Sequence, residues 1–386
     1  MRYDVLILGL GGMGSATAYQ VASRGRRVLG LEQFTAAHDR GSSHGRTRVI
    51  RQSYYEDPAY VPLLLRAYDL WRQIERETGA DLLHEVGGLM LGAESGDVVH
   101  GSLRSARTHG LEHELLDARE IRRRFPVLNP SADTVALYEK KAGYLRPEES
   151  VRAHLTRAAA LGADLRFEET VLGWEPKGSG VRVVTTKGAY EADRLVLSPG
   201  PWAPAVLADL RLPLVVERQV LYWFEPDGGI GPFQPDRFPI YLWEAEGGLV
   251  PYGFPATDGP DGGVKAAYYR APVEEPCTPG TIDRTVRAAE TEHLRATLRE
   301  RIPALAGRCL HATTCLYTNT PDKAFVLTVH PTSPQVSLAC GFSGHGFKFC
   351  SVVGEIMADL ALDGGTRHDI GLFRLDRLKP GPGSVR

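Results

Sequence analysis

The sequence predicts an α/β protein that combines a parallel sheet with a second region of short strands. An apolar run at residues 5–8 is typical of a buried parallel strand, and it ends in the pattern Gly9-x-Gly11-x-x-Gly14. A helical stretch follows at residues 12–24. Further along the chain, alternating strand and helix patterns are interrupted twice by segments rich in short strands. The N-terminal strand, glycine turn and helix together indicate a Rossmann-like dinucleotide-binding fold.

Each glycine of this turn has a distinct physical role in such a fold. Gly9 allows the tight turn, Gly11 lets the backbone approach a pyrophosphate, and Gly14 lets the helix pack close to the strand. The free N–H groups at the start of the helix would face the phosphates. A second strand is expected at residues 27–32, and Glu32 lies 18 residues after Gly14. Its carboxylate would accept hydrogen bonds from ribose hydroxyls, which favours FAD or NAD over NADP.

The composition is that of an ordinary globular protein. The chain has 386 residues, of which 43% are hydrophobic and 24% charged, and its net charge is −2. This balance gives no indication of nucleic-acid binding. No apolar run approaches the roughly 20 residues needed to span a bilayer. The first strand begins within a few residues of Met1, so we expect no signal peptide and a cytoplasmic protein without membrane association.

The five cysteines are scattered and odd in number, without a C-x-x-C pair. This pattern indicates neither a disulfide framework nor a metal site. Most of them are expected to be buried free thiols. They are Cys277, Cys309, Cys315, Cys340 and Cys350.

A polar segment at residues 33–55 contains a cluster of arginines and leads into a helix that Gly79 is expected to end. A loop of this length is usually functional or disordered. Because regular elements flank it on both sides, we expect it to be ordered around an anionic group. A solvated basic loop is the alternative.

Both domains are expected to be discontinuous. Residues 1–80, 144–214 and 320–386 would form the dinucleotide-binding domain. Residues 81–143 and 215–319 would form the substrate domain, which we expect to be built around a β-sheet.

Periodicity places the other elements. Helices are expected near residues 103–124, 147–161, 286–300 and 347–362. Strands are expected at residues 89–91, 134–138, 181–186, 194–198, 215–216, 220–224, 240–243, 264–269 and 336–340.

Two further glycine turns follow strands of the predicted nucleotide domain. Gly200 lies in the turn after residues 194–198, at the sheet edge where ligands of open α/β sheets bind. Residues 341–346 form a glycine-rich turn before the last helix, whose N-terminus could face the other end of the cofactor. For a flavin, this helix end would stabilise the negative charge that hydride uptake leaves on the ring. An ordinary strand–turn–helix connection is the alternative.

Several stretches, taken together and in order, resemble the monomeric sarcosine oxidases over essentially the whole chain. The wider family includes N-methyltryptophan, pipecolate and fructosyl-amino-acid oxidases. The stretches are the first glycine turn with Glu32, GSSHGRTRVIRQSYYEDPAYVPL, YGFP followed by Lys265, CLYTNTPD from Cys315, and GFSGHGFKF from Gly341. The resemblance implies an FAD-binding fold of the glutathione-reductase/D-amino-acid-oxidase type and a monomeric oxidase. Its reaction would convert sarcosine into glycine, formaldehyde and hydrogen peroxide.

The resemblance also implies roles for particular residues. Arg51 and Lys348 would hold the substrate carboxylate, for which an arginine fork and a lysine point charge are suited. The thiol of Cys315 would bond covalently to the flavin, a reaction that requires a thiolate. Arg48 and Lys265 would lie against the flavin ring, where Lys265 would assist the reaction with dioxygen.

The remaining implied positions belong to the substrate cavity and the cofactor site. Tyr252 and Tyr317 would line the substrate cavity. The predicted FAD contacts are Gly9, Gly11, Gly12, Met13, Gly14, Glu32, Ser43, His44, Thr47, Val171, Gly200, Cys315, Phe342, Gly344, Gly346 and Lys348.

The chain departs from the family pattern at two positions. Tyr269 stands where the sarcosine oxidases carry a histidine of the substrate pocket, so the preferred substrate is left open. Arg46 replaces an acidic residue and is expected to add positive charge near the cofactor. Leu242 and Trp243 fall near a substrate-contacting position, with their register undetermined.

Other functions remain open at this stage. The substrate could be another N-alkyl or cyclic amino acid, such as N-methyltryptophan, pipecolate, a proline-like compound or a fructosyl amino acid. An FAD dehydrogenase with a different electron acceptor, an NAD-linked dehydrogenase and a flavin-binding protein without turnover are the further alternatives.

Overall fold

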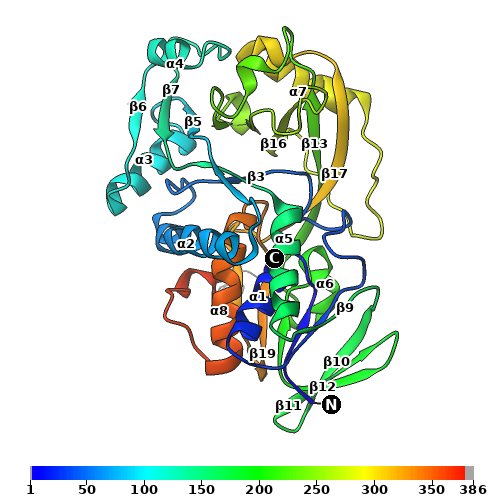
Figure 1. The fold of residues 1–386 in the computed structure, drawn as a ribbon. Helices are drawn as coiled ribbons and strands as arrows, with labels where there is room; N and C mark the ends of the chain where they lie inside the picture. Colours follow the sequence, from blue (N-terminus) through cyan, green and yellow to red (C-terminus); the bar gives the residue numbers. More distant parts are fainter. Residues whose placement is uncertain (1, 379–386) are drawn as a thin grey trace, which may run out of the picture.

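The computed structural model describes residues 2–378 and contains two large β-sheets (Figure 1). The first sheet has a parallel core in the order β9, β2, β1, β12, β19, extended by antiparallel neighbours. Its strands are β1 (Arg2–Leu8), β2 (Val28–Leu31), β9 (Asp164–Arg166), β10 (Val171–Lys177), β11 (Gly180–Thr185), β12 (Ala189–Leu197), β18 (Val326–His330) and β19 (Ser333–Cys340). A buried, apolar parallel core of this kind is typical of dinucleotide-binding folds.

Helices cover this sheet on the side where α1 packs between α5 and α8 (Figure 1). The helices are α1 (Gly12–Ser23), α2 (Val61–Thr78), α5 (Pro147–Ala160) and α8 (Cys350–Asp363), with the short α6 (Ala203–Val206) elsewhere. Gly79 ends α2 in the left-handed conformation, with φ of 70°. Trp71 of α2 is fully buried and donates to the carbonyl of Lys348, which ties α2 to the start of α8.

The second sheet also has eight strands, in the order β17, β13, β16, β15, β14, β5, β7, β6. The strands are β5 (Gly88–Gly92), β6 (Glu114–Leu116), β7 (Val135–Glu139), β13 (Val215–Phe224), β14 (Ile240–Trp243), β15 (Val250–Gly253), β16 (Val264–Arg270) and β17 (Cys309–Asn319). Its helices are α3 (Asp97–His109), α4 (Ala118–Arg124) and α7 (Ala288–Arg301).

A third, small antiparallel sheet has three strands, with β8 in its centre. It consists of β3 (Arg48–Ile50), β8 (Gly143–Leu145) and β4 (Leu83–Glu85). Because Arg48 pairs with Leu145 in this sheet, the arginine-rich loop after β2 is anchored to the segment that precedes α5.

We propose the domain boundaries that the sequence predicts, and the origin of the strands supports them. Strands of the first sheet come from residues 1–80, 144–214 and 320–386. Strands of the second sheet come from residues 81–143 and 215–319.

The expected helix near residues 103–124 is wrong. Gly110 ends α3 with φ of 61°, and the Asp117 carboxylate caps a separate helix, α4, by accepting from the N–H of Glu120. Between them β6 pairs with β7.

Two other segments differ from the sequence prediction. The expected strands at 215–216 and 220–224 are one strand, β13, because the polar side chains of residues 217–219 are buried and hide the apolar pattern. The last helix begins at Cys350, after a 3₁₀ turn at Phe347–Phe349. The strands that the sequence did not reveal are β3, β4, β6, β8, β9, β10, β15, β17 and β18.

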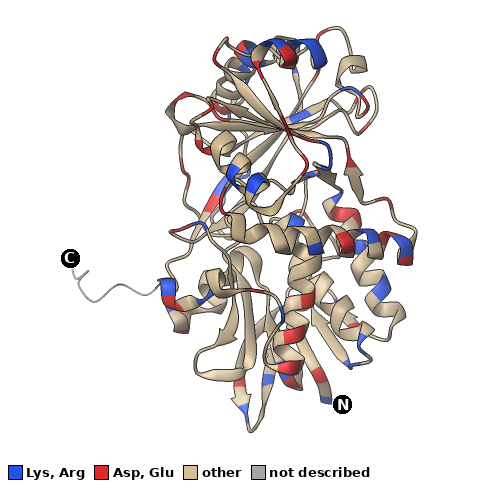
Figure 2. Cartoon of the chain, turned by 90° about the vertical axis from the view of Figure 1, so that its left-hand side faces the viewer, with Lys and Arg blue, Asp and Glu red and all other residues tan. Residues whose placement is uncertain are grey.

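Charged residues of both signs are interspersed along the helices, as Figure 2 shows for one side of the molecule. Within residues 2–378, the helices are too short or too polar to cross a membrane.

Candidate FAD and substrate site

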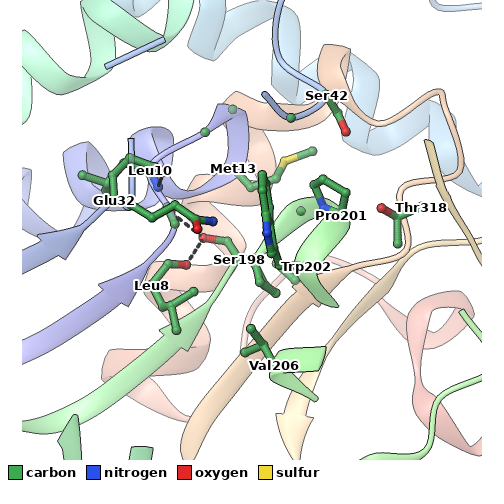
Figure 3. A pocket seen from close by; sticks show the side chains of 18 of the residues that line it. Leu8, Leu10, Met13, Glu32, Ser42, Ser198, Pro201, Trp202, Val206 and Thr318 are labelled. Atoms are coloured by element: carbon green, nitrogen blue, oxygen red, sulfur yellow. Dashed lines mark hydrogen bonds between the residues drawn. The ribbon is translucent and has the colours of Figure 1, made fainter. Parts of the chain in front are cut away.

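A cavity of about 850 Å³ lies at the carboxyl ends of the parallel strands of the first sheet. It reaches from the ends of β1 and β2, which Leu8 and Glu32 mark in Figure 3, to the glycine turn before α8. Ligands of open parallel sheets bind at this edge. The position and size of the cavity therefore suit a dinucleotide.

The first glycine turn has no room for side chains. A Cβ atom on Gly9 would lie 2.5 Å from the carbonyl oxygen of Ser198, and one on Gly14 would lie 1.8 Å from the carbonyl oxygen of Gly9. Gly11 and Gly12 line the cavity, together with Met13, whereas Gly14 packs behind them. The helix N-terminus is thereby exposed to the cavity, as phosphate binding requires.

Glu32 is held rigidly at the end of β2. It is 6% exposed, and its carboxylate accepts from the N–H groups of Leu10 at 2.9 Å and Phe34 at 3.1 Å. Glu32 lines the cavity, so a carboxylate oxygen is available to a ribose.

The other predicted contacts divide into two groups. Ser43, Val171, Gly200, Phe342, Gly344 and Gly346 line the large cavity. His44, Thr47, Cys315 and Lys348 do not line it, although all four are buried, and neither does the buried Lys265, which was predicted to lie against the flavin ring. Burial, with a contribution from Arg48, lowers the pKa of His44 to about 4, so this imidazole is neutral at ordinary pH.

Thr318 is a cavity residue that the sequence did not indicate. Its hydroxyl oxygen is buried without a hydrogen-bond partner among the described residues, and the side chain faces the cavity (Figure 3). A buried polar atom without a partner is costly, so this hydroxyl fits a polar group of the cofactor. The sequence of β17 does contain an indication of this position, because alternate side chains of a strand lie on the same face. Leu316 and Thr318 line the large cavity, whereas Cys315 lines only a neighbouring smaller chamber.

This smaller chamber, which we call the inner chamber, has a volume of about 50 Å³. It shares Arg48, Tyr317, Gly344 and Phe347 with the large cavity, so the two spaces adjoin. The structure brings the predicted substrate residues together here with two residues predicted to lie at the flavin. The substrate residues are Arg51, Tyr252, Tyr317 and Lys348, and the flavin residues are Arg48 and Cys315.

Arg51 is buried and precisely oriented. Its guanidinium donates to the carbonyl of Ser53 at 2.8 Å and to the carboxylate of Glu56 at 2.7 Å, and it stacks over the rings of Tyr54 and Tyr55. Burial opposes its charge, but Glu56 and the two tyrosines raise its pKa above the ordinary value. Its Nε is buried without a partner among the described residues, so it can still donate to a ligand.

Lys348 is a second buried cation of the inner chamber. Its Nζ donates to the carbonyl of His345 at 2.7 Å. Burial lowers its pKa to about 7, with a further contribution from the charge of Arg51, while Glu56 opposes the change. The charge of Lys348 can therefore change near neutral pH.

His345 links Tyr54, beside the inner chamber, to the backbone at Lys323, and these two hydrogen bonds fix its tautomer. Its Nε2 lies 2.9 Å from the carbonyl of Lys323, which can only accept, so Nε2 carries the proton. Its Nδ1 then accepts from the hydroxyl of Tyr54, whose ring lies beneath Arg51. Burial lowers the pKa of His345 to about 4, consistent with this neutral form.

The loop between β2 and α2 is clamped by charged side chains from distant segments. Glu148 of α5 accepts from the N–H of Gly45 at 2.6 Å and from that of Arg46 at 3.1 Å. From the opposite side, Lys265 of β16 donates to the carbonyls of Gly45 at 2.6 Å and Thr47 at 2.8 Å. Burial and then Arg48 lower the pKa of Lys265 well below its ordinary value.

Glu139, at the end of β7, holds the next part of the same loop. It is 1% exposed and accepts from the N–H groups of Gln52 and Ser53, each at 2.7 Å. Burial raises its pKa. These contacts fix the backbone directly after Arg51. The sequence gave no indication of the role of Glu139, because the contact joins segments 86 residues apart.

Cys315 is buried at the border of the inner chamber. Burial raises the pKa of its thiol, and the charges of Arg48 and Lys265 act in the opposite direction. Of the two residues with undetermined register, Leu242 lines the inner chamber and Trp243 belongs to the core of the second sheet.

Arg46 does not bring positive charge to the cavity, which corrects the expectation from the sequence. Its guanidinium lies 3.2 Å from the carboxylate of Asp258 and stacks over Trp223. The backbone at this residue has φ of 66°, and Arg46 lines neither the large cavity nor the inner chamber.

Comparison with known proteins agrees with this geometry. A model of the family described as FAD dependent oxidoreductase matches residues 4–360. A monomeric sarcosine oxidase of Streptomyces avermitilis is 56% identical over 381 residues, covering 98% of this chain and 99% of that protein. An N-methyl-L-tryptophan oxidase of Yersinia pestis is 32% identical, covering 98% and 100%. The solved structure of NikD, described as an unusual amino acid oxidase essential for nikkomycin biosynthesis, has a TM-score of 0.83 at 27% identity, with 97% of each chain covered.

The chain therefore belongs to the FAD dependent oxidoreductase family, and it is an FAD-dependent enzyme. Within that family it belongs with the monomeric sarcosine oxidases. The fold class and the family that the sequence predicted are both confirmed.

The low pKa of Lys348 leads to a testable pH dependence. If protonated Lys348 binds a carboxylate, the affinity of the FAD-loaded protein for acetate should fall as the pH rises, by up to about tenfold per unit above about pH 7. Titration of the flavin absorbance with acetate at several pH values measures this. Lys348→Met should bind acetate more weakly and with a flat profile. A flat profile in the unmodified protein would contradict the prediction.

Proposed function

We propose that the protein oxidises N-methyl amino acids, with sarcosine as its substrate. Sarcosine, water and dioxygen would give glycine, formaldehyde and hydrogen peroxide. Identity of 56% over nearly the whole chain to a monomeric sarcosine oxidase supports this proposal, and the more distant N-methyl-L-tryptophan oxidase supports the same class of reaction.

The observation that carries the proposal is the excess of positive charge in the inner chamber. Arg48, Arg51 and Lys348 line it, against one carboxylate from Glu56. Because the chamber adjoins the dinucleotide cavity, a bound carboxylate would hold the rest of a small amino acid beside the cofactor. An apolar amine without a carboxylate would leave these cations uncompensated.

When bound, FAD supplies the redox chemistry, by accepting a hydride equivalent and passing two electrons to dioxygen. The chain's own residues then have the tasks of binding and orientation. Arg51 and Lys348 would fix the carboxylate, and Tyr252 and Tyr317 would confine the remaining atoms of the substrate. Hydride transfer from a neutral amine depends mainly on such positioning of the substrate, so no side chain needs to act as a strong base.

We further propose that the chain works as a monomer, in agreement with the name of its relatives.

An anaerobic absorbance spectrum of the purified protein tests the proposed function. We expect the flavin bands to bleach on addition of sarcosine and to return with hydrogen peroxide when air is admitted. Bleaching without peroxide would indicate another electron acceptor. Bands that persist with sarcosine but bleach with N-methyl-L-tryptophan, pipecolate or a fructosyl amino acid would assign a different substrate.

We also propose that Cys315 forms a thioether with the 8-methyl carbon of the flavin. The carbon–sulfur bond replaces the S–H bond and one C–H bond, and the two hydrogens and their electrons pass finally to dioxygen as hydrogen peroxide. The position of the Cys315 thiol at the inner chamber supports this bond. The charges of Arg48 and Lys265 also support it, because they favour the thiolate and so oppose the effect of burial.

Denaturation of the protein distinguishes a covalent flavin from a bound one. Acid-precipitated protein and its mass spectrum should retain one FAD, whereas Cys315→Ser should release it completely. Cys350→Ser is the matched control, because Cys350 is also buried and lines the large cavity. Flavin that remains attached in Cys315→Ser, or is lost equally in the control, would contradict the assignment.

Lys265 is proposed to promote the reaction with dioxygen, where a fixed cation would stabilise developing superoxide. Lys265→Met should slow flavin reoxidation by at least about tenfold, with much less effect on anaerobic reduction by sarcosine. Stopped-flow absorbance separates the two steps, with the exposed Lys140→Met as control. Equal slowing of both steps would instead assign Lys265 to the support of the loop that carries Arg48.

A further inference from the structure

A second chamber lies beyond the inner one, and neither the family pattern nor the proposed reaction gives it a role. This outer chamber has a volume of about 500 Å³ and is lined by α3, β16 with the segment after it, and the end of β17. It opens to solvent, since Val273 on its lining is 67% exposed. The inner and outer chambers share Glu56, Tyr269 and Tyr317.

The side chain of Tyr269 stands at the border between the chambers. Its ring centroid lies 6.5 Å from those of Tyr55 and Tyr317 and 6.3 Å from that of His345. The ring is thus held by aromatic neighbours on three sides. Such contacts favour one orientation of the ring.

The position of Tyr269 in β16 determines which way its side chain points. Neighbouring side chains in a strand point to opposite faces of the sheet. Tyr268 packs into the core of the second sheet, where its hydroxyl lies within hydrogen-bond distance of His293 and Thr297. The side chain of Tyr269 therefore points to the opposite face of the second sheet, toward the two chambers.

The two chambers differ in their chemistry. The inner one is small and carries an excess of cations. The outer one mixes both signs of charge, including Arg104, Lys323, Glu217 and Glu274, for which the structure shows no ion pair with another described residue. A polar chain that entered the outer chamber could be hydrated or paired there.

We propose that Tyr269 limits the size of the substrate, because its ring closes the passage from the inner to the outer chamber. With the ring in place, the enzyme accepts N-methyl amino acids with no Cα substituent or a very small one. Without the ring, a longer and polar Cα substituent extends into the outer chamber. This inference rests on the proposed oxidation of N-methyl amino acids.

Steady-state kinetics of purified, FAD-loaded variants tests the inference. The substrates are sarcosine, N-methyl-L-alanine, N-methyl-L-norvaline and N-methyl-L-glutamine. For the unmodified enzyme, kcat/KM should fall by at least about 100-fold from sarcosine to N-methyl-L-glutamine. Tyr269→Ala should reduce this ratio by at least about tenfold, through faster oxidation of the larger substrates. The polar glutamine chain should gain more than the apolar norvaline chain.

Tyr269→Phe is the matched control, because it keeps the ring and removes only the hydroxyl. It should retain the selectivity of the unmodified enzyme. If Tyr269→Ala does not retain FAD, Tyr269→Leu replaces it. Equal oxidation of all four substrates by the unmodified enzyme, or unchanged ratios in a folded Ala or Leu variant, would overturn the inference while the proposed function stands. Failure of the unmodified enzyme to oxidise any N-methyl amino acid would overturn the proposed function itself.

Discussion

The site depends on the clamping of one loop by charged side chains from α5 and from the second sheet. The loop between β2 and α2 supplies Arg48 and Arg51, yet its regular structure is limited to β3 and a 3₁₀ turn at Pro58–Tyr60. Glu148 and Glu139 accept from its N–H groups, and Lys265 donates to its carbonyls. Glu139 and Lys265 are buried and Glu148 is half-buried, so losing one partner would leave an uncompensated polar group. The clamp therefore fixes the loop where the two sheets meet.

The clamped loop carries Arg48 and Arg51, and the two adjoining cavities consequently differ in the groups that offer positive charge. Backbone N–H groups and glycine turns line the dinucleotide cavity, where the phosphates of FAD would lie, whereas side-chain cations gather in the inner chamber. Arg51 keeps its charge because Glu56 and the tyrosine rings compensate its burial. Lys348 has weaker compensation, so its pKa falls to about 7. Two cations with different protonation behaviour can thus act on one carboxylate.

Most of the residues that line the two cavities could be proposed from the sequence, because they occur in short motifs that resemble those of the sarcosine oxidases. The glycine turn and Glu32 follow the geometry of a single βαβ unit, and the lysine of GFSGHGFKF follows a second glycine turn. Thr318 was missed because β17 lacks a regular alternation of polar and apolar residues, since the apolar Leu316 and the polar Thr318 both line the large cavity. Arg46 was placed wrongly, since the direction of its side chain follows from a left-handed backbone turn and from Asp258.

The dinucleotide fold could be predicted from the sequence because it follows from local patterns of period and spacing, whereas the family and the residue types of the site came from the resemblance of short stretches to known oxidases. The tertiary structure alone decided which residues meet. Glu139 reaches the backbone after Arg51 from a distant strand, and Tyr269 of β16 contacts Tyr55 and Tyr317 from two other segments. Such contacts arise when segments far apart in the chain pack against each other. Their distances and directions depend on the whole fold, and no local pattern encodes them.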